Sequence, residues 1–356
     1  MWKDNPITAR LQIQWPIIQA GMAGGPTTVE LVAAVSAAGG LGTLGAAYMS
    51  PGQIRDAIRA IRELTDKPFG INLFIPEPFD ASQPVAAPVA KVMNEFREQL
   101  GIPADPVVTR YTEPFEEQMA VVVEEKVPVF SFTFGVLEQR WLEELKRLGT
   151  TVIGTATTVR EAVALEASGV DMVTAQGSEA GGHRGSFLPD SPSNLVGTMA
   201  LVPQIVDRVK IPVIAAGGIM DGRGIAAAFA LGAGAVQLGT AFLTCGESGA
   251  HPEHKRAIRE ASDEGTVITR AFSGKSARGI ENEFMRRLDP HDSELPPYPV
   301  QNALTRDIRS AAAKQGKGEY LSMWAGQAAS LSREVSAGEL VRQLVAETER
   351  VCRGMC

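Results

Sequence analysis

Residues 170–185 read V-D-M-V-T-A-Q-G-S-E-A-G-G-H-R-G, a short, mainly apolar run followed at once by a glycine-rich loop. The run over residues 170–175 favours a buried strand, because it is short and lacks a strict apolar–polar alternation. The loop combines four glycines with single glutamine, glutamate, histidine and arginine residues. Glycine allows positive φ and close backbone approach, which a plain connection does not require. We therefore expect a strand that presents His183 at a functional site.

Short apolar runs of this kind recur along the chain, and most are followed by a stretch with helical periodicity. The expected strands cover residues 16–20, 41–45, 69–75, 127–134, 151–155, 170–175, 212–216 and 235–238. Helices are expected over residues 28–38, 51–64, 137–148, 158–167, 194–209 and 222–230. Strands buried on both faces by helices have this apolar character. Eight such units favour an α/β fold, a (β/α)8 TIM barrel, over an open sheet.

The third connection, over residues 76–126, is too long for a simple turn. It begins with the proline-rich sequence P-E-P-F-D and ends in a helix expected over residues 114–125. Long connections in compact domains commonly cover an active site. We therefore expect an excursion over the barrel mouth.

Beyond residue 246 the strand–helix alternation stops. Helices are expected over residues 251–261, 277–288 and 303–314, with a short strand over residues 266–271. The last helix places Leu340, Val341, Leu344 and Val345 on one face. We therefore predict a barrel over residues 1–246, a smaller, mainly helical lobe over residues 247–327 that covers the site, and a C-terminal helix within residues 328–356 that packs back on the barrel.

The composition is that of a globular protein without a polyanion-binding surface. The 356 residues carry a net charge of −7, which argues against nucleic acid or a polybasic membrane patch. The uncharged residues 224–246 are long enough to cross a bilayer, but their glycines and Gln237 favour a helix, a turn and a strand. The three cysteines (Cys245, Cys352 and Cys356) give no disulfide framework, and no apolar signal region is present. We expect a cytoplasmic monomer or homodimer.

Candidate site residues follow the expected strands, because catalytic groups of a β/α barrel lie on the loops at the carboxyl ends. In chain order these residues are Gly21, Met22, Asn72, Ser131, Thr133, Gln176, Gly181, Gly182, Gly217, Gly218, Gln237, Leu238, Gly239 and Thr240.

The glycines after the last two strands predict a phosphate site. Backbone N–H groups at Gly217, Gly218 and Gly239, with the Thr240 hydroxyl, suit a dianion. A tight turn between strand and helix would require the same glycine pair.

Amide side chains on three strands suit the edge of a flavin ring. Asn72, Gln176 and Gln237 offer both donors and acceptors, so FMN would account for the amides and the phosphate site together. Alternatively, Asn72 and Gln237 are interior polar residues bonded to neighbouring backbone.

His183 is the candidate for chemistry, because its glycine-rich loop directly follows a strand. A structural histidine held by hydrogen bonds is the alternative. His251 and His254 are one helical turn apart, but their charged surroundings predict a solvated helix start and no metal pair. The sequence contains no metal-binding motif, and Cys245 lies in an apolar run typical of packing.

Seven motifs occur in order between about residues 16 and 327. They are Q-A-G-M-A-G-G-P, V-P-V-F-S-F-T-F-G, A-Q-G-S-E-A-G-G-H-R-G, A-A-G-G-I, Q-L-G-T-A-F, P-Y-P-V-Q-N-A-L-T-R and M-W-A-G-Q. Together they resemble the nitronate monooxygenase family, formerly 2-nitropropane dioxygenase, and its bacterial class I branch above all. The resemblance implies a TIM barrel with non-covalent FMN and a helical lobe over the flavin. It also implies that dioxygen oxidises alkyl nitronates, propionate 3-nitronate above all, to a carbonyl compound and nitrite.

The resemblance also implies roles for individual residues. The FMN site would comprise Gly21, Met22, Asn72, Gln176, Gly181, Gly182, Gly217, Gly218, Gln237, Leu238, Gly239 and Thr240. His183 would face the reactive edge of the flavin and the substrate, and Tyr298 would reach in from the lobe. Many class I members carry a second histidine where this chain has Thr133, so we expect the substrate contacts to differ in detail.

Relatives with most of these motifs define two alternative functions: an FMN-dependent NAD(P)H:quinone reductase and a flavin-type enoyl-acyl-carrier-protein reductase. Both need a nicotinamide donor, and the sequence has no separate G-x-G-x-x-G fingerprint, although barrel flavoenzymes can bind NAD(P)H without one. A flavin-free barrel lyase or isomerase acting on a phosphorylated metabolite is a third alternative. A non-catalytic binding protein would leave His183 unexplained. Nothing in the sequence gives Arg184 a chemical role.

Overall fold

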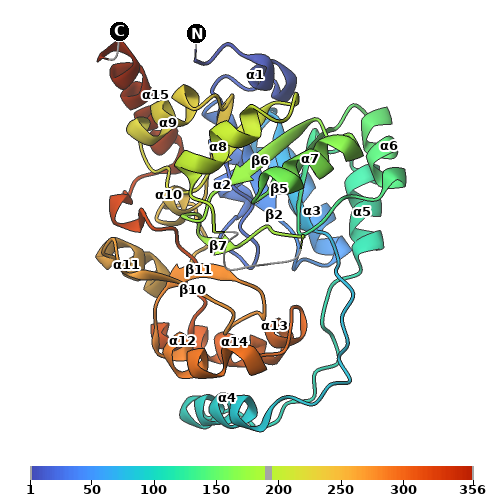
Figure 1. The fold of residues 1–356 in the computed structure, drawn as a ribbon, viewed down its shortest axis with the longest axis vertical. Coiled ribbons are helices and arrows are strands. Elements are labelled where there is room, and N and C mark those ends of the chain that lie inside the picture. Colours follow the sequence, from blue (N-terminus) through green and yellow to red (C-terminus); the bar gives the residue numbers. More distant parts are fainter. Residues whose placement is uncertain (1, 189–194, 355–356) are drawn as a thin grey trace.

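The computed structural model describes residues 2–188 and 195–354 (Figure 1). The expected start of a helix at Asn194 and the last cysteine, Cys356, lie outside the described residues.

The described strands of the main sheet are all parallel and form a nearly closed barrel in the order β1-β9-β8-β6-β5-β4-β3-β2. An additional parallel bridge between Ile18 and Leu41 brings the two ends of this order together. The strands are β1 (Ile17–Gln19), β2 (Gly42–Gly45), β3 (Phe69–Phe74), β4 (Val129–Thr133), β5 (Thr151–Ala156), β6 (Met172–Gln176), β8 (Val213–Ala216) and β9 (Ala235–Leu238). The predicted (β/α)8 TIM barrel is confirmed.

Helices pack around this barrel, and the apolar core lies between them and the strands. They are α2 (Val29–Ala37), α3 (Pro51–Leu64), α5 (Phe115–Glu124), α6 (Gln139–Arg147), α7 (Val159–Ser168), α8 (Thr198–Val206), α9 (Gly222–Ala230) and α15 (Ala337–Gly354). The last helix contacts α9 and α2 and buries Leu340, Val341 and Leu344 against them. The uncharged stretch 224–246 divides into α9, β9 and the short α10 (Thr240–Leu243). Among the described residues, no helix is both long and apolar enough to cross a bilayer.

A separate apolar cluster fills one end of the barrel interior. It joins Ile18, Val129 and Ile153 of the strands to Ile7 and Leu11 of α1 (Pro6–Leu11). Asn5 caps α1 by accepting hydrogen bonds from the N–H groups of Ile7 and Thr8. Because this cluster occupies the N-terminal end of the strands, the open space of the barrel lies at their carboxyl ends.

The lobe contains a small sheet, which the sequence did not predict. The elements of the lobe, in chain order, are α11 (Pro252–Glu260), β10 (Thr266–Thr269), β11 (Ala277–Ile280), α12 (Glu283–Leu288), η2 (Asp289–Glu294), α13 (Val300–Leu304), α14 (Arg306–Gln315), η3 (Gly318–Tyr320) and η4 (Ala329–Leu331). The helix expected over residues 277–288 is wrong in its first part, since β11 pairs with β10 and with β7 (Gly182–His183). Pairing with distant strands outweighs the helical pattern here.

The long third connection contains a helix that the sequence did not predict, α4 (Ala87–Leu100). Figure 1 shows the connection extending from the barrel to the far side of the lobe, where α4 contacts α12 and α14. Phe96 stacks on Phe284 with ring centroids 4.9 Å apart, and the buried Arg97 pairs with Asp307 at 2.8 Å. The excursion therefore does not end at the barrel mouth but completes the apolar core of the lobe.

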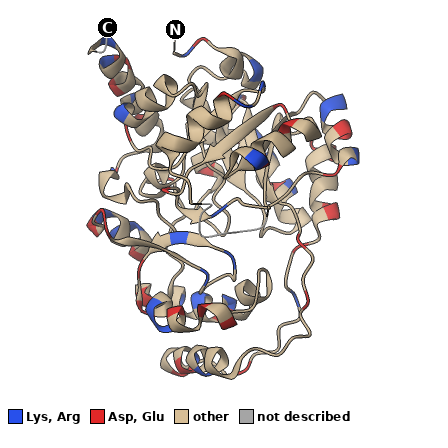
Figure 2. Ribbon diagram, in the orientation of Figure 1, with Lys and Arg blue, Asp and Glu red and all other residues tan. Residues whose placement is uncertain are grey.

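Charged residues lie mainly on the outer helices and in the lobe, and Figure 2 shows both signs interspersed there. This distribution agrees with a modest negative net charge and no extended polybasic surface in the drawn view.

Barrel packing generates a stability prediction at Gly42. A Cβ atom on this strand glycine would overlap the carbonyl oxygen of Val32 on α2, which is backbone and cannot rotate away. Gly42→Ala should therefore destabilise the fold by about 1–3 kcal/mol. Thermal unfolding measures this, with Gly52→Ala on α3 as the matched control, because Gly52 has only the flexible Ser50 hydroxyl at 4.0 Å. Equal melting temperatures for the two variants would contradict the predicted close packing.

Candidate active site

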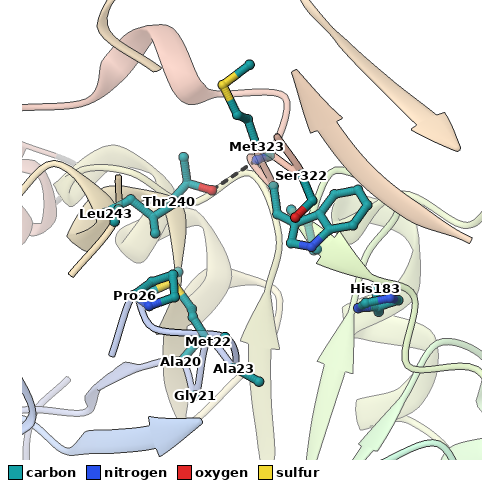
Figure 3. Close-up of a pocket in the computed structure, with 18 of the residues that line it drawn as sticks. Ala20, Gly21, Met22, Ala23, Pro26, His183, Thr240, Leu243, Ser322 and Met323 are labelled. Carbon is teal, nitrogen blue, oxygen red and sulfur yellow. Dashed lines mark hydrogen bonds between the residues drawn. The ribbon is translucent and has the colours of Figure 1, made fainter. Parts of the chain in front are cut away.

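The carboxyl ends of the barrel strands open into a cavity of about 470 Å³, a size typical of small-molecule sites. Loops after β1, β6, β8 and β9 line it, together with α14 and residues 321–326 of the lobe side. Figure 3 shows the loop after β1 on one side, Ser322 and Met323 opposite, and His183 at the edge. Barrel and lobe therefore build the cavity together.

The structure brings the predicted cofactor-binding residues to this one cavity. Its lining includes Gly21, Met22, Asn72, Gln176, Gly181, Gly182, Gly217, Gly218, Gln237, Leu238, Gly239 and Thr240. Thr133 and His183 line it as well, whereas Tyr298 does not. Ligand binding by each residue stays a prediction.

Two of these glycines are required by protein neighbours. A Cβ atom at Gly21 would lie 2.6 Å from Cβ of Asn72, and one at Gly181 would lie 2.5 Å from the backbone nitrogen of Gly326. Gly21 thus lets the first loop pack on β3, and Gly181 lets the β6 loop pack on the lobe. These glycines, predicted from the sequence to form a binding site, are therefore also needed for close packing of the protein itself.

The loops after β8 and β9 lie side by side, because Ala216 pairs with Gln237. Gly217 and Gly218 have φ values of +116° and +70°, which favour glycine. In the neighbouring loop the Thr240 hydroxyl accepts a hydrogen bond from Gly326 N–H at 2.9 Å, shown as the dashed line in Figure 3. The hydroxyl hydrogen is then available to a ligand in the cavity.

The loop after β6 is fixed by hydrogen bonds to Gln176. Its Nε2 donates to the carbonyl of His183 at 3.0 Å, and its Oε1 accepts from Gly185 N–H at 2.7 Å. The buried Arg184 donates to the carbonyl oxygens of Gln176 and Gly177 at 3.1 and 2.7 Å. Gln176 and Arg184 therefore shape the loop, a role that the sequence did not indicate for either residue.

The backbone of His183 belongs to the lobe sheet, where it pairs with Ala277 of β11. Its Nε2 lies 2.8 Å from Oγ of Ser273, whose hydroxyl in turn donates to the carbonyl of Lys275 at 3.1 Å. When Ser273 donates to Lys275, Nε2–H of His183 donates to Ser273 and Nδ1 is an acceptor; when Ser273 accepts from Lys275 N–H at 3.3 Å and donates to Nε2, Nδ1 carries the hydrogen and can donate to a bound anion. Ser273 is the orienting partner that the sequence did not reveal.

His183 is electrically neutral over the physiological pH range. Burial, together with the charges of Lys275 and Arg309, lowers the pKa of His183 to about 3. Aromatic rings surround the imidazole, with centroids 5.5 Å away for Trp324, 5.8 Å for Phe134 and 6.1 Å for Tyr298. The predicted substrate residue Tyr298 thus lies beside His183, although outside the cavity lining.

The predicted amide Asn72 also has a protein partner, since its Nδ2 donates to Oγ of Ser131 at 2.9 Å. This contact matches the alternative interpretation of an interior polar residue satisfied by its neighbours. The bond engages one amide hydrogen and leaves the rest of the amide to the cavity that Asn72 lines.

The lobe contributes cavity residues that sequence reasoning missed. They are Asn302, Arg306, Arg309, Ser310, Ser322, Met323 and Trp324, with His251 and His254 from α11 and its cap. The expected solvated helix start is wrong for His254, which is buried and lies with Nε2 3.0 Å from the carbonyl of Trp324. Burial lowers the pKa of His254 to about 4. In the sequence, the three-residue spacing of Arg306 and Arg309 places both on one helical face, and this spacing could have indicated that they belong to the site.

Metal and thiol chemistry have little support at this cavity. Among residues 2–188 and 195–354, no group of three or more histidine, cysteine or acidic side chains could hold a metal ion. Cys245 is buried in the core, and burial raises its pKa to about 12, so its thiol stays protonated.

Comparisons with known proteins agree on one family. The family model described as Nitronate monooxygenase matches residues 5–347. A probable nitronate monooxygenase of Staphylococcus haemolyticus (strain JCSC1435) is 47% identical over 351 residues, 98% of each chain. A crystal structure of nitroalkane oxidase from Streptomyces ansochromogenes matches with a TM-score of 0.89 and 39% identity, covering 99% of this chain and 100% of that one. The structure of FabK from Thermotoga maritima matches with a TM-score of 0.77 and 35% identity, covering 98% and 97% of the two chains.

The family match spans nearly the whole chain, barrel and lobe alike, so it includes every segment that lines the cavity. This chain belongs to the nitronate monooxygenase family.

Proposed function

We propose that the protein is an FMN-dependent monooxygenase that oxidises alkyl nitronates, including propionate 3-nitronate, with dioxygen to a carbonyl compound and nitrite. It acts on small molecules and is a cytoplasmic monomer or homodimer. The observation that carries the proposal is the neutral His183, which lies among aromatic rings at the edge of a cavity whose glycine-rich turns also present the Thr240 hydroxyl.

The state of His183 favours a nitronate over a neutral nitroalkane as substrate. A nitroalkane must lose a carbon-bound proton, and a base whose pKa is lowered to about 3 accepts that proton poorly. A nitronate is already deprotonated, so it needs a hydrogen-bonding group and not a base. With Thr133 on β4 in place of a second histidine, the described cavity has no imidazole on that strand to take over as base.

The residues of the cavity fit FMN. The two turns with Gly217, Gly218, Gly239 and the Thr240 hydroxyl offer donors for a phosphate at adjacent strand ends. Gly21 and Met22 lie along the floor, where a flat ring would contact them, and Asn72 and Gln237 provide amides from β3 and β9. When bound, FMN would supply electron acceptance and the reaction with dioxygen.

The chain itself would bind and shield the substrate. His183 would orient the anionic nitro group through Nδ1–H, in the tautomer in which the Ser273 hydroxyl donates to Nε2 and holds the imidazole in place. The rings of Phe134, Tyr298 and Trp324 would exclude water from the reacting carbon.

A reductase is the second candidate, because FMN-dependent NAD(P)H:quinone reductases and flavin-type enoyl-acyl-carrier-protein reductases share most of the motifs of this chain. One pair of measurements on the purified protein separates the two. Nitrite release from propionate 3-nitronate in air is expected at catalytic rates, with slow anaerobic flavin reduction by NADH or NADPH. Rapid flavin reduction without nitrite release would refute the monooxygenase proposal, and a colourless protein that binds no flavin would refute both.

The imidazole of His183 can be tested directly. His183→Asn should retain FMN, since the backbone pairing with β11 is kept, but should lose about 10²-fold or more in turnover. Flavin absorbance and steady-state nitrite release measure the two effects. His291→Asn is the matched control, because His291 lies on η2 and outside the cavity lining. Full activity in His183→Asn would show that the imidazole has no role in the reaction.

The half-buried His183 and the buried His254 also predict the acid sensitivity of the fold. Their folded-state pKa values of about 3 and about 4 lie below the ordinary value of 6.5. As the pH falls below about 6.5, the unfolded chain binds protons that the folded chain does not, so stability is lost at up to about 1.4 kcal/mol per pH unit for each histidine.

When the pH is lowered from about 7 to about 5, the melting temperature of His183→Asn should therefore decrease less than that of the wild type. Thermal unfolding at both pH values measures this difference, again with His291→Asn as the control. An identical loss in His183→Asn and the wild type would mean that His183 titrates normally in the folded protein.

A further inference from the structure

The wall of the cavity formed by α14 carries two positive charges that face the site. Arg306 and Arg309 are three residues apart on this helix, so they share a face, and both line the cavity. Asp307, the neighbouring acid, is engaged by Arg97 at 2.8 Å. Within the described ranges, neither Arg306 nor Arg309 has a carboxylate at ion-pair distance. The cavity therefore contains uncompensated positive charge.

Arg309 is held in position by neutral groups only. Its Nη2 donates to the backbone carbonyl and to Oδ1 of Asn302 at 2.7 and 2.9 Å, and its Nε lies 3.4 Å from the carbonyl of Thr305. Neutral acceptors orient a guanidinium without cancelling its charge. Burial lowers the pKa of Arg309, yet arginine stays protonated in proteins. A fixed, partly buried cation is suited to an anionic ligand.

A buried hydroxyl lies in the same region. Tyr48 lines the cavity, and its buried hydroxyl lies beside the hydroxyl of Tyr298. Tyr48, His183 and Arg309 all line the same cavity, and the charge of Arg309 acts on both of the other two side chains. Lys275, the other cation near His183, is paired with Glu77 at 2.9 Å and so offers no comparable charge.

We infer that Arg306 and Arg309 determine specificity by binding an anionic group that the substrate carries away from its reacting carbon. The inference rests on the proposed function and makes nitronates with a distal carboxylate the preferred class. Guanidinium groups match the planar carboxylate in shape and in hydrogen-bond geometry. The phosphate of a nicotinamide dinucleotide is a similar anion. The experiment below therefore distinguishes a substrate carboxylate from a nucleotide phosphate as the group that the arginines bind.

The test compares kcat/KM for propionate 3-nitronate and for propyl-1-nitronate, which lacks the carboxylate. In Arg306→Gln and in Arg309→Gln, the ratio of the two values should fall about tenfold or more, while Arg306→Lys and Arg309→Lys should restore part of it. Lys314→Gln is the matched control, because this exposed residue of α14 lies outside the cavity lining and should keep the wild-type ratio. Because Arg309 also holds Asn302, the exposed Arg306 provides the variant that is expected to fold.

A binding measurement without turnover accompanies the kinetics. Quenching of Trp324, which lines the cavity, should report tighter binding of 3-nitropropionate than of 1-nitropropane, and both glutamine variants should remove that preference. A replacement of Trp324 by phenylalanine identifies its signal among the four tryptophans.

Four outcomes contradict the inference. In both glutamine variants, the two kcat/KM values could stay unchanged, which leaves the ratio at the wild-type level. Both kcat/KM values could instead fall by the same factor, which would indicate a structural role. The lysine variants could fail to restore any selectivity. The variants could raise KM for NADPH in anaerobic flavin reduction with the nitronate ratio intact, which would assign the arginines to a nucleotide phosphate. Failure of the wild type to release nitrite from either nitronate would instead refute the proposed function.

Discussion

The antiparallel pairing of Gly182 and His183 with β11 joins the two parts of the molecule at the site itself. By position in the chain these residues form the loop after the sixth barrel strand, and by hydrogen bonding they are an edge strand of the lobe. The orientation of the imidazole therefore depends on a contact nearly a hundred residues away in sequence. Gln176 holds the barrel side of this junction, and Ser273 holds the lobe side. The cavity has a fixed shape only while both sides are in place.

Charge is distributed unevenly along the cavity. The turns with Gly217, Gly218 and Thr240 offer backbone and hydroxyl donors, the uncharged His183 lies among aromatic rings at the edge of the cavity, and α14 adds guanidinium groups. The cations and the neutral imidazole are linked physically, because the charges of Lys275 and Arg309 add to burial in opposing a proton on His183. An anion bound beside Arg309 would weaken that opposition, so occupancy of the site and the protonation of its histidine are coupled.

The barrel could be predicted from the sequence almost strand by strand, because strands buried on both faces leave short apolar runs. The positions of Asn72 within β3, Gln176 at the end of β6 and Thr240 just after β9 followed from the same pattern. The lobe was less predictable. The short strand expected over residues 266–271 is present as β10, but its pairing with residues 277–280, and their pairing with β7, could not be predicted, and α4 buries its apolar face against helices nearly two hundred residues later. The burial of His254 depends on packing that appears only when the lobe docks on the barrel.

The position of α4 has a consequence for the order in which the chain can fold during synthesis. Val89, Met93 and Phe96 leave the ribosome long before Phe284 and Leu288, the side chains on which they pack. At 5–20 residues per second, the interval is on the order of ten to forty seconds. During this interval the barrel strands up to β9 can associate as they emerge, while the apolar helix α4 on its long tether has no partner. The nascent chain thus presents α4 to the chaperones of the cell as a temporary binding segment.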